Sequence, residues 1–253
     1  MKLRLALLAA TALAFTTPAI AADMPAYVTA AVSNADRSAA ETARDANRKP
    51  ADMVAFAGIK PGDKIVDLVP GKDAYFTHIF ANVVGSSGHV YSFMPTELDG
   101  ELASHKPPIQ LPPDGTVDPK WPNVTFVHHS LVALDLPEKV DVVWTSQNYH
   151  DFHDKFMGPV DMAKYNKAVF DALKPGGTYI VLDHAAPGAG PEVTETLHRI
   201  NPDVVKTEVE AAGFKFVGES DVLHNPADDH SKNVFDPSIR GKTDQFVFKF
   251  EKP

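Results

Sequence analysis

The chain has 253 residues, a formal net charge of −9 and no cysteine. The absence of cysteine excludes disulfides, thiolate metal sites and cysteine nucleophiles. The acidic balance argues against a nucleic-acid partner, because affinity for phosphate backbones comes from clustered Lys and Arg side chains.

The first 21 residues are predicted to be a secretory signal peptide. Lys2 and Arg4 give a basic start, an apolar run covers residues 5–15, and Ala19-Ile20-Ala21 has the small-x-small pattern of a cleavage site. The run is too short to span a bilayer as a permanent helix. We therefore expect export to the periplasm, a mature chain that begins near Ala22 and no stable membrane anchor. The alternative is an uncleaved N-terminal anchor.

The mature chain is predicted to consist of an N-terminal helical segment, residues 22–50, and one domain over residues 51–253. Lys49-Pro50 ends the first segment, because the residue before a proline avoids the helical region. Asp52 is predicted to cap the next helix. In the first segment, Arg44, Asp45 and Arg48 either fold over a pocket as a lid or form a solvated helix face with ion pairs, and we favour the solvated face.

Strands and helices are predicted to alternate along the first part of the domain. The apolar side chains of residues 76–84 recur with the period of one helix face, and a second helix is expected over 159–173. Residues 95–122 contain seven prolines and are predicted to form a long surface loop with at most a short helix. The expected strands are residues 64–68, 89–93, 124–127, 140–144 and 178–183.

The C-terminal part is predicted to add an antiparallel strand pair. Lys174-Pro175-Gly176-Gly177 is expected to be a tight turn before the fifth strand, and residues 200–212 suit a helix. No helix separates the last two strands, residues 214–223 and 245–250, so they should pair antiparallel. The alternation before them indicates right-handed crossovers and a mostly parallel α/β sheet.

Three features resemble the class I, Rossmann-like S-adenosylmethionine-dependent methyltransferases: Ile65-Val66-Asp67-Leu68 through Gly71, Leu173-Lys174-Pro175-Gly176-Gly177, and the terminal strand pair. More narrowly, the segments 67–77, 147–151 and 241–244 are similar to a group of exported bacterial predicted methyltransferases. The resemblance implies a seven-stranded, mostly parallel sheet with helices on both faces. It also implies S-adenosylmethionine as cofactor, bound over the ends of strands one, two and four.

The resemblance implies that a set of residues at these strand ends contacts the cofactor: Asp67, Gly71, Phe93, Ser130 and Asn148. The sequence departs from the family pattern at three places. Val69 and Asp73 stand where the first turn of the family has glycines, and strand two ends without its acidic residue, with Glu97 the nearest carboxylate. Ser130 stands where the family often has Asp after strand three.

The segment after strand four is predicted to carry the catalytic residues Tyr149, His150 and Asp151. Substrates meet the cofactor at this edge of such sheets, and an unperturbed histidine titrates near neutrality, so His150 is a candidate general base. The alternative is that Asn148 and His150 form structural hydrogen bonds to neighbouring loops. Asp183-His184 ends strand five on the same edge and is a candidate for contact with the substrate.

The histidines also raise the possibility of a metal centre. His150 and His153 stand at i, i+3, and Asp151, Asp154, His184 or the pair 128–129 are candidates to complete a set of nitrogen and oxygen ligands. Because spacing on a loop fixes no geometry, we predict no metal site. The charged clusters at 228–230 and 240–242 are expected to keep their loop in water.

Three functions are compatible with this sequence. The favoured one is a methyltransferase-like enzyme that acts on a small molecule of unknown identity. The second is a non-catalytic periplasmic binding or accessory protein that has kept the fold and lost the cofactor, since S-adenosylmethionine is made in the cytosol. The third is a metal-assisted hydrolase that uses the histidines.

Overall fold

The computed structural model describes residues 24–158, 160–188 and 193–253. The predicted signal peptide lies outside the described residues, as does Pro159, the expected start of one helix. Within the described ranges, none of the helices has the length and apolar character needed to cross a membrane.

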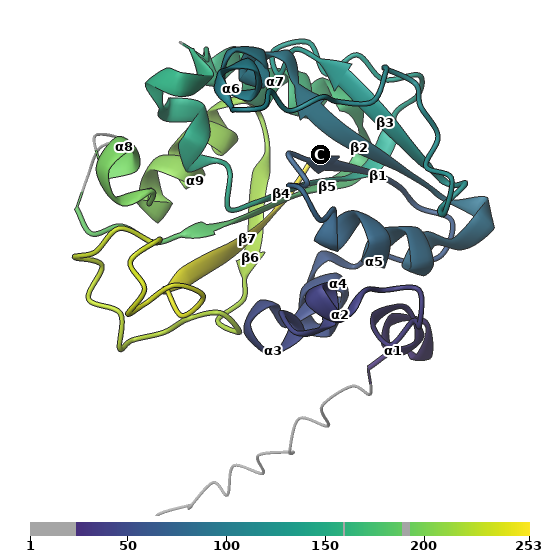
Figure 1. Ribbon diagram of the computed structural model, residues 1–253, viewed down its shortest axis with the longest axis horizontal. Coiled ribbons are helices and arrows are strands. Elements are labelled where there is room, and N and C mark those ends of the chain that lie inside the picture. Colours follow the sequence, from purple (N-terminus) through teal and green to yellow (C-terminus); the bar gives the residue numbers. More distant parts are fainter. Residues whose placement is uncertain (1–23, 159, 189–192) are drawn as a thin grey trace, which may run out of the picture.

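A seven-stranded sheet forms the centre of the molecule (Figure 1). Its strand order is β3-β2-β1-β4-β5-β7-β6, and β1 to β5 run parallel while β7 is antiparallel to both β5 and β6. The predicted fold class, a mostly parallel Rossmann-like sheet with a C-terminal antiparallel pair, is confirmed. The strands are β1 (Lys64–Leu68), β2 (His89–Pro95), β3 (Val124–His129), β4 (Val140–Ser146), β5 (Leu173–His184), β6 (Lys215–Glu219) and β7 (Gln245–Glu251).

Helices cover both faces of the sheet, as predicted (Figure 1). Alternate residues of a strand point to opposite faces, so Ile65 packs into one apolar cluster and Val66 into the other. The first cluster lies under α1 (Ala26–Val32), α4 (Pro50–Ala57) and α5 (Tyr75–Val84), and the second under α7 (Met162–Ala172) and α9 (Pro202–Ala211). Each fully buried aliphatic side chain contributes about 1.5–3 kcal/mol, which holds the layers together.

The N-terminal segment, which was predicted to be helical, forms three short helices. After α1 come α2 (Ala39–Thr42) and α3 (Asp45–Arg48), and α4 begins directly at Pro50. The expected capping role of Asp52 is wrong, because Lys49 is the N-cap and Asp52 lies inside the first turn of α4. Proline suits the first helical position, since its missing N–H would have no partner there.

Some boundaries differ from the predictions. Lys174-Pro175-Gly176-Gly177 is an irregularity inside β5 rather than a turn before it, with a shift of register against β4. The strand β6 ends at Glu219, and α8 (Thr194–Leu197) was not expected. The proline-rich loop holds one short helix, α6 (Asp99–Ser104), beside the 3₁₀ turn η2 (Thr96–Leu98). The other 3₁₀ turns are η1 (Gly85–Ser87), η3 (His150–His153) and η4 (Lys155–Met157).

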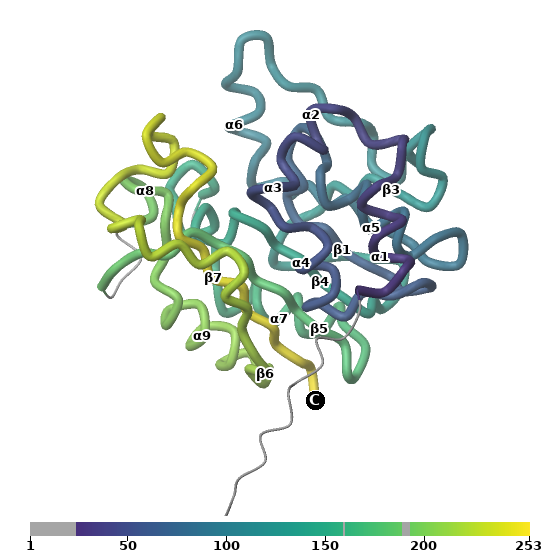
Figure 2. The backbone as a smooth tube through the Cα atoms, turned by 90° about the horizontal axis from the view of Figure 1, so that it is seen from below, coloured from purple at the N-terminus to yellow at the C-terminus, as the bar shows by residue number. Residues whose placement is uncertain are grey.

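The last long loop, residues 220–244, lies beside α3 (Figures 1 and 2). A Cβ atom on Gly241 of this loop would lie 3.4 Å from the Nδ2 atom of Asn47 in α3. Two segments almost 200 residues apart in the sequence therefore lie side by side near the carboxyl ends of the strands. Residues from both segments line the cavity described below.

Candidate functional site

The strands β1 and β4 are neighbours at the centre of the sheet, and the chain order reverses between them. From β1 the order runs outward through β2 and β3, and from β4 it runs the other way through β5. Loops leaving two such strands diverge, and the crevice between them is where ligands bind in open α/β sheets. Here the crevice lies between the first turn, residues 69–74, and the residues after β4.

The first turn has an unusual backbone. Val69, Gly71 and Ala74 all have positive φ, at 50°, 71° and 45°. A left-handed conformation costs a residue with a Cβ about 1–2 kcal/mol, and valine is especially resistant to it. Val69 is held there by two hydrogen bonds: its N–H donates to the carbonyl of Phe93 at 2.8 Å, and its carbonyl accepts from Asn148 Nδ2 at 3.1 Å. Maintained strain of this kind is characteristic of functional turns.

We expect the strain at Val69 to be measurable with two substitutions. Val69→Ala and Val69→Gly remove nearly the same apolar surface, but only glycine tolerates positive φ. The glycine variant should therefore be more stable than the alanine variant by about 1 kcal/mol in urea unfolding. At an ordinary strand position such as Val66 the order should be reversed, because glycine is there the less stable residue. An alanine variant equal to or more stable than the glycine variant would disprove the strain.

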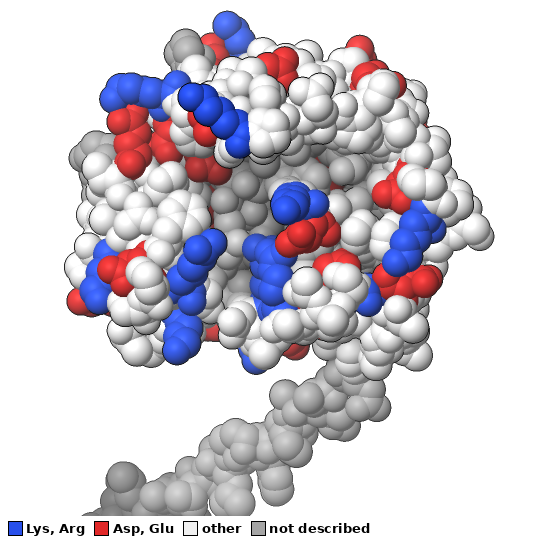
Figure 3. Space-filling view, in the orientation of Figure 1, with Lys and Arg blue, Asp and Glu red and all other residues white. Residues whose placement is uncertain are grey.

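Two adjoining cavities open in the crevice, with volumes of about 180 Å³ and 450 Å³. Figure 3 shows this face hollowed near its middle, with Lys and Arg side chains beside the hollow. The smaller, which we call the turn cavity, is lined by the first turn, Asp67, Phe76 and residues 146–148. The larger, the outer cavity, is lined by His184, Gln245 and the loop residues Val234, Phe235 and Arg240. Both share Arg44, Arg48, Asp73 and Gln147.

Arg48 lies between the two cavities. Its guanidinium donates to Gln147 Oε1 at 2.7 Å, and it lies over the ring of Tyr75 at 5.1 Å. Among the described residues no carboxylate forms an ion pair with it, whereas Arg44 pairs with Asp73 at 3.2 Å. Burial and repulsion from Arg44 lower the pKa of Arg48 to about 10, which still leaves it charged at neutral pH. The favoured solvated-face interpretation is wrong for Arg48, since this cation lines the site.

Asp67 is one of the polar residues that line the turn cavity. Its Oδ2 accepts a hydrogen bond from Thr77 Oγ1 at 2.6 Å, and its side chain is buried. Burial raises the pKa of Asp67 to about 7, against the opposing effects of the Thr77 hydrogen bond and the charge of Arg48. Beside it, the buried Oγ atom of Ser146 has no hydrogen-bond partner among the described residues. The cavity is therefore lined by a half-buried cation, a buried carboxyl and a hydroxyl without a hydrogen-bond partner among the described residues.

His184 is the histidine that faces the outer cavity. Burial lowers its pKa to about 4, so its imidazole is neutral at physiological pH. Its Nδ1 atom lies 2.8 Å from Thr243 Oγ1, which fixes the ring. Of the pair Asp183-His184, which was predicted to contact a substrate, His184 lines a cavity. Asp183 is fully buried behind it and accepts from the ring and backbone N–H of His150, both at 2.8 Å.

The three predicted catalytic residues do not line either cavity. Tyr149 is fully buried under α9, with its hydroxyl 2.8 Å from Glu208 Oε2, and burial raises its pKa well above the usual value. His150 lies between Asp183 and Asp151. Burial favours its neutral form, but the two carboxylates outweigh burial and raise its pKa to about 10. A histidine that stays protonated at neutral pH cannot serve as a general base.

The predicted cofactor residues divide into two groups. Asp67, Gly71 and Asn148 line the turn cavity, whereas Phe93 is buried in the core and reaches the turn only through its carbonyl. Ser130 is occupied elsewhere: its Oγ donates to Glu97 Oε1 at 2.6 Å. Glu97 also accepts from the N–H of Leu131, at 3.1 Å. The described residues thus supply no free carboxylate from the end of β2.

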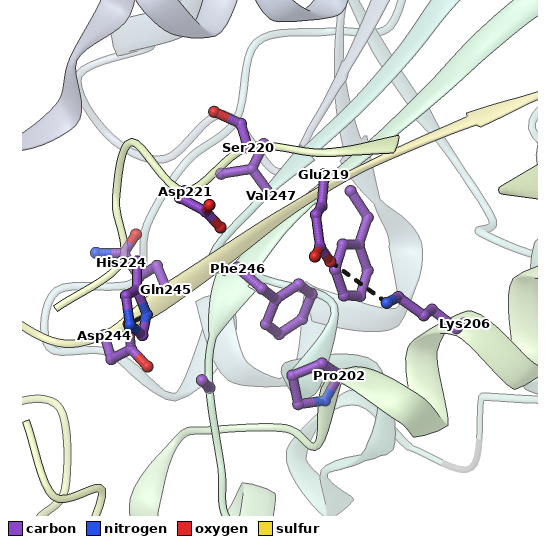
Figure 4. Close-up of a pocket in the computed structure, with 12 residues that line it drawn as sticks. Pro202, Lys206, Glu219, Ser220, Asp221, His224, Asp244, Gln245, Phe246 and Val247 are labelled. Carbon is purple, nitrogen blue, oxygen red and sulfur yellow. Dashed lines mark hydrogen bonds and ion pairs between the residues drawn. The ribbon is translucent and has the colours of Figure 1, made fainter. Parts of the chain in front are cut away.

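Another cavity lies away from this site, between α9 and the β6–β7 edge (Figure 4). It measures about 220 Å³, and Lys206 and Glu219 face one another across it at 3.4 Å. It holds none of the residues predicted from the sequence. Lys206 is paired with Glu219, and His224 with Asp244, so most of the cavity's charged groups are already engaged.

The fold can be compared with known proteins on this basis. Neither a protein-family model nor a curated protein sequence matches the chain. Among solved structures, an S-adenosylmethionine-dependent methyltransferase from Aquifex aeolicus is similar with a TM-score of 0.53 at 17% identity, covering 80% of this chain and 88% of that one. The arsenic(III) S-adenosylmethionine methyltransferase of Chlamydomonas reinhardtii gives 0.51 at 17%, covering 90% and 73%. A methyltransferase from Mesorhizobium loti gives 0.50 at 14%, covering 82% and 99%.

The chain has the class I methyltransferase fold. The likeness extends over most of each chain, and the strand order with the antiparallel β7 belongs to the same topology. At these identities the likeness establishes the methyltransferase fold and no further property.

Sequence reasoning missed several residues that line the cavities of this methyltransferase fold. Val234, Phe235 and Arg240 come from a loop interpreted as solvated, and Ser146 lies one residue before the segment singled out. Arg240 was noticed in the sequence as part of the charged cluster at 240–242, but that cluster was expected to face water. No local pattern indicated that its loop turns back toward α3 and the cavities.

Proposed function

We propose that this protein is an S-adenosylmethionine-dependent methyltransferase that acts on a small molecule. The observation that carries the proposal is the turn cavity: it lies at the chain reversal between β1 and β4, and its polar groups match the amino-acid half of that cofactor. Arg48 would pair with the carboxylate, and Asp67 and Ser146 would receive the amino group. Arg48 and Ser146 have bonding capacity to spare within the described residues, which favours a charged, polar ligand.

The adenosine half would lie toward the ends of β2 and β3. There Glu97 is the nearest carboxylate, but it is engaged by Ser130 and Leu131. A ribose could use Glu97 only by replacing these hydrogen bonds. The fit is therefore good for the amino-acid half and incomplete for the ribose.

The outer cavity is the proposed place for the methyl acceptor. When bound, the cofactor supplies an electrophilic methyl group, so the protein must chiefly position a nucleophile and remove its proton. The neutral His184 is a hydrogen-bond partner for such a nucleophile, and Phe235 offers an apolar surface. Arg44 and Arg240 make the wall basic, which favours an acceptor with negative charge.

The proposal is tested by calorimetric titration of the purified protein with S-adenosylmethionine and S-adenosylhomocysteine. We expect one site per chain, and much weaker binding of adenosine alone, because the groups identified above contact the amino-acid half. Both ligands should also raise the melting temperature by mass action. Absence of heat with both would contradict methyl transfer and favour a binding protein that has kept the fold.

The N-terminal sequence supports a further part of the proposal, that the protein acts after export to the periplasm. Its basic start, short apolar run and small-residue cleavage pattern match those of a secretory signal. Mass spectrometry of the protein from the periplasmic fraction of its host should find a chain that begins near Ala22. An intact Met1 in a cytosolic fraction would contradict export.

A further inference from the structure

We propose that His150, Asp151 and His198 form a binding site for a zinc ion or a similar divalent transition metal. This site is separate from both cavities, since none of the three residues lines them. It also does not depend on the proposed methyl transfer. Spacing in the sequence did not reveal it, because His198 stands 47 positions after Asp151.

The donor atoms are close to the arrangement that such an ion requires. Nε2 of His150 lies 3.1 Å from Oδ1 of Asp151, and Nδ1 of His198 lies 3.8 Å from the same oxygen. One ligand atom from each of the three residues lies within 4.8 Å of the others. Zinc binds imidazole and carboxylate at about 2.0–2.2 Å, so donors around a tetrahedral ion stand roughly 3.3–3.6 Å apart. Small side-chain rotations would therefore complete the site.

Asp183 supports His150 in the way that a second carboxylate supports a metal-binding histidine. Oδ1 of Asp183 accepts from the Nδ1 of His150 at 2.8 Å, and Oδ2 accepts from the backbone N–H of the same residue at 2.8 Å. This pair fixes the imidazole and directs its Nε2 toward Asp151. A bound ion would replace the proton on Nε2, because metal ions bind the deprotonated nitrogen and release its proton. A carboxylate that orients a ligating histidine in this way is the usual support of zinc ligands and increases their basicity.

The local charge also favours a cation. The carboxylates of Asp151 and Asp183 lie 3.1 Å and 2.8 Å from the two ring nitrogens of His150. Three residues after Asp151, Oδ1 of Asp154 is buried without a hydrogen-bond partner among the described residues. Three protein ligands leave one tetrahedral position for water or another group. Imidazole with carboxylate suits zinc, whereas magnesium and calcium prefer oxygen alone.

The position of the site indicates its role. His150 and Asp151 belong to η3 after β4, and His198 follows α8, so an ion would join two loops of the carboxyl edge. The ring centroids of His198 and Phe235 lie 5.0 Å apart, and Phe235 lines the outer cavity. By holding His198 in place, a bound ion would also hold Phe235 in the wall of that cavity. Of the other histidines considered from the sequence, His153 instead faces Glu208 at 3.2 Å.

The test is calorimetric titration of the full chain with ZnCl₂ after removal of metals with EDTA. We expect one ion per chain, and at 100 times the dissociation constant a rise in melting temperature of about 5–10 °C. His198→Ala and Asp151→Asn should each weaken Zn²⁺ binding at least about tenfold. Both residues are partly exposed, so the variants should fold, and circular dichroism checks this. Mg²⁺ should not bind at this site.

The matched control is His224→Ala, because His224 contacts Asp244 at 2.9 Å in another histidine–aspartate cluster. Its Zn²⁺ affinity should equal that of the unchanged protein. Failure of the unchanged protein to bind Zn²⁺ would overturn the proposal. So would full affinity in both His198→Ala and Asp151→Asn, or loss of affinity in His224→Ala alone. Binding of S-adenosylmethionine by the metal-free protein is measured separately, so the two proposals can fail independently.

Discussion

Arg48→Ala is expected to weaken the binding of S-adenosylmethionine by about 10- to 100-fold. The half-buried guanidinium has one hydrogen-bond acceptor, Gln147 Oε1, and no ion-pair partner among the described residues, so most of its donors remain for a ligand. A hydrogen bond to a charged group contributes about 1.5–3 kcal/mol, which corresponds to this change in the dissociation constant. Isothermal titration calorimetry of the variant and the unchanged protein measures it.

Arg44→Ala provides the matched control for this experiment. Arg44 lines the same two cavities, but its side chain is 37% exposed and already pairs with Asp73. Screening by water limits what an exposed charge contributes, so its loss should change cofactor affinity less than threefold. Equal affinities for the Arg48 variant and the unchanged protein would mean that the cofactor carboxylate lies elsewhere.

Asp67→Asn is expected to change how stability depends on pH. A carboxyl with a pKa of about 7 in the native state and about 3.9 when unfolded holds more protons in the native state between these values. The unchanged protein therefore loses stability from Asp67 as pH rises from 4 to 7, by about 4 kcal/mol in total at 1.36 kcal/mol per pH unit. The asparagine variant has no such loss, and its relative stability should rise over this range.

Urea unfolding at pH 4.5, 6 and 8 measures this difference. His184 acts with the opposite sign, because a pKa lowered to about 4 makes stability rise with pH between 4 and 6.5. Comparing variant with unchanged protein cancels that contribution. Asp73→Asn, on the exposed part of the same turn, should show no pH-dependent difference of this size. A constant difference for Asp67→Asn at all three pH values would show that Asp67 is ionised throughout.

The predictions that succeeded rest on local patterns. The apolar side chains of α5 recur with helical period, and the strand before the first turn is a short apolar run, so both elements could be located within a few residues. The resemblance of 65–71 and 173–177 to one family then implied a seven-stranded, mostly parallel sheet. Asp67 and Gly71 could be placed at the crevice because Asp67 lies near the end of β1 and Gly71 in the turn that follows, and this end of the strand must face the crevice.

The catalytic residues could not be chosen in the same way. Tyr149, His150 and Asp151 follow a strand in an irregular turn, where no periodicity indicates which side chain faces the cavity. Tyr149 turns inward because Glu208 and Asn166 satisfy its hydroxyl, and both partners come from helices later in the chain. The histidine that lines the outer cavity is instead His184, the last residue of β5.

By itself the sequence determined the order and type of the elements and the position of the first turn, because hydrophobic period and turn chemistry act over a few residues. The tertiary structure alone decided which side chains meet. Arg48 contacts Gln147, 99 positions away, and His198 lies beside Asp151. Such contacts depend on how helices and loops pack on the sheet. That packing is decided by burial and hydrogen bonding over the whole chain, so it cannot be predicted from a short segment of the sequence.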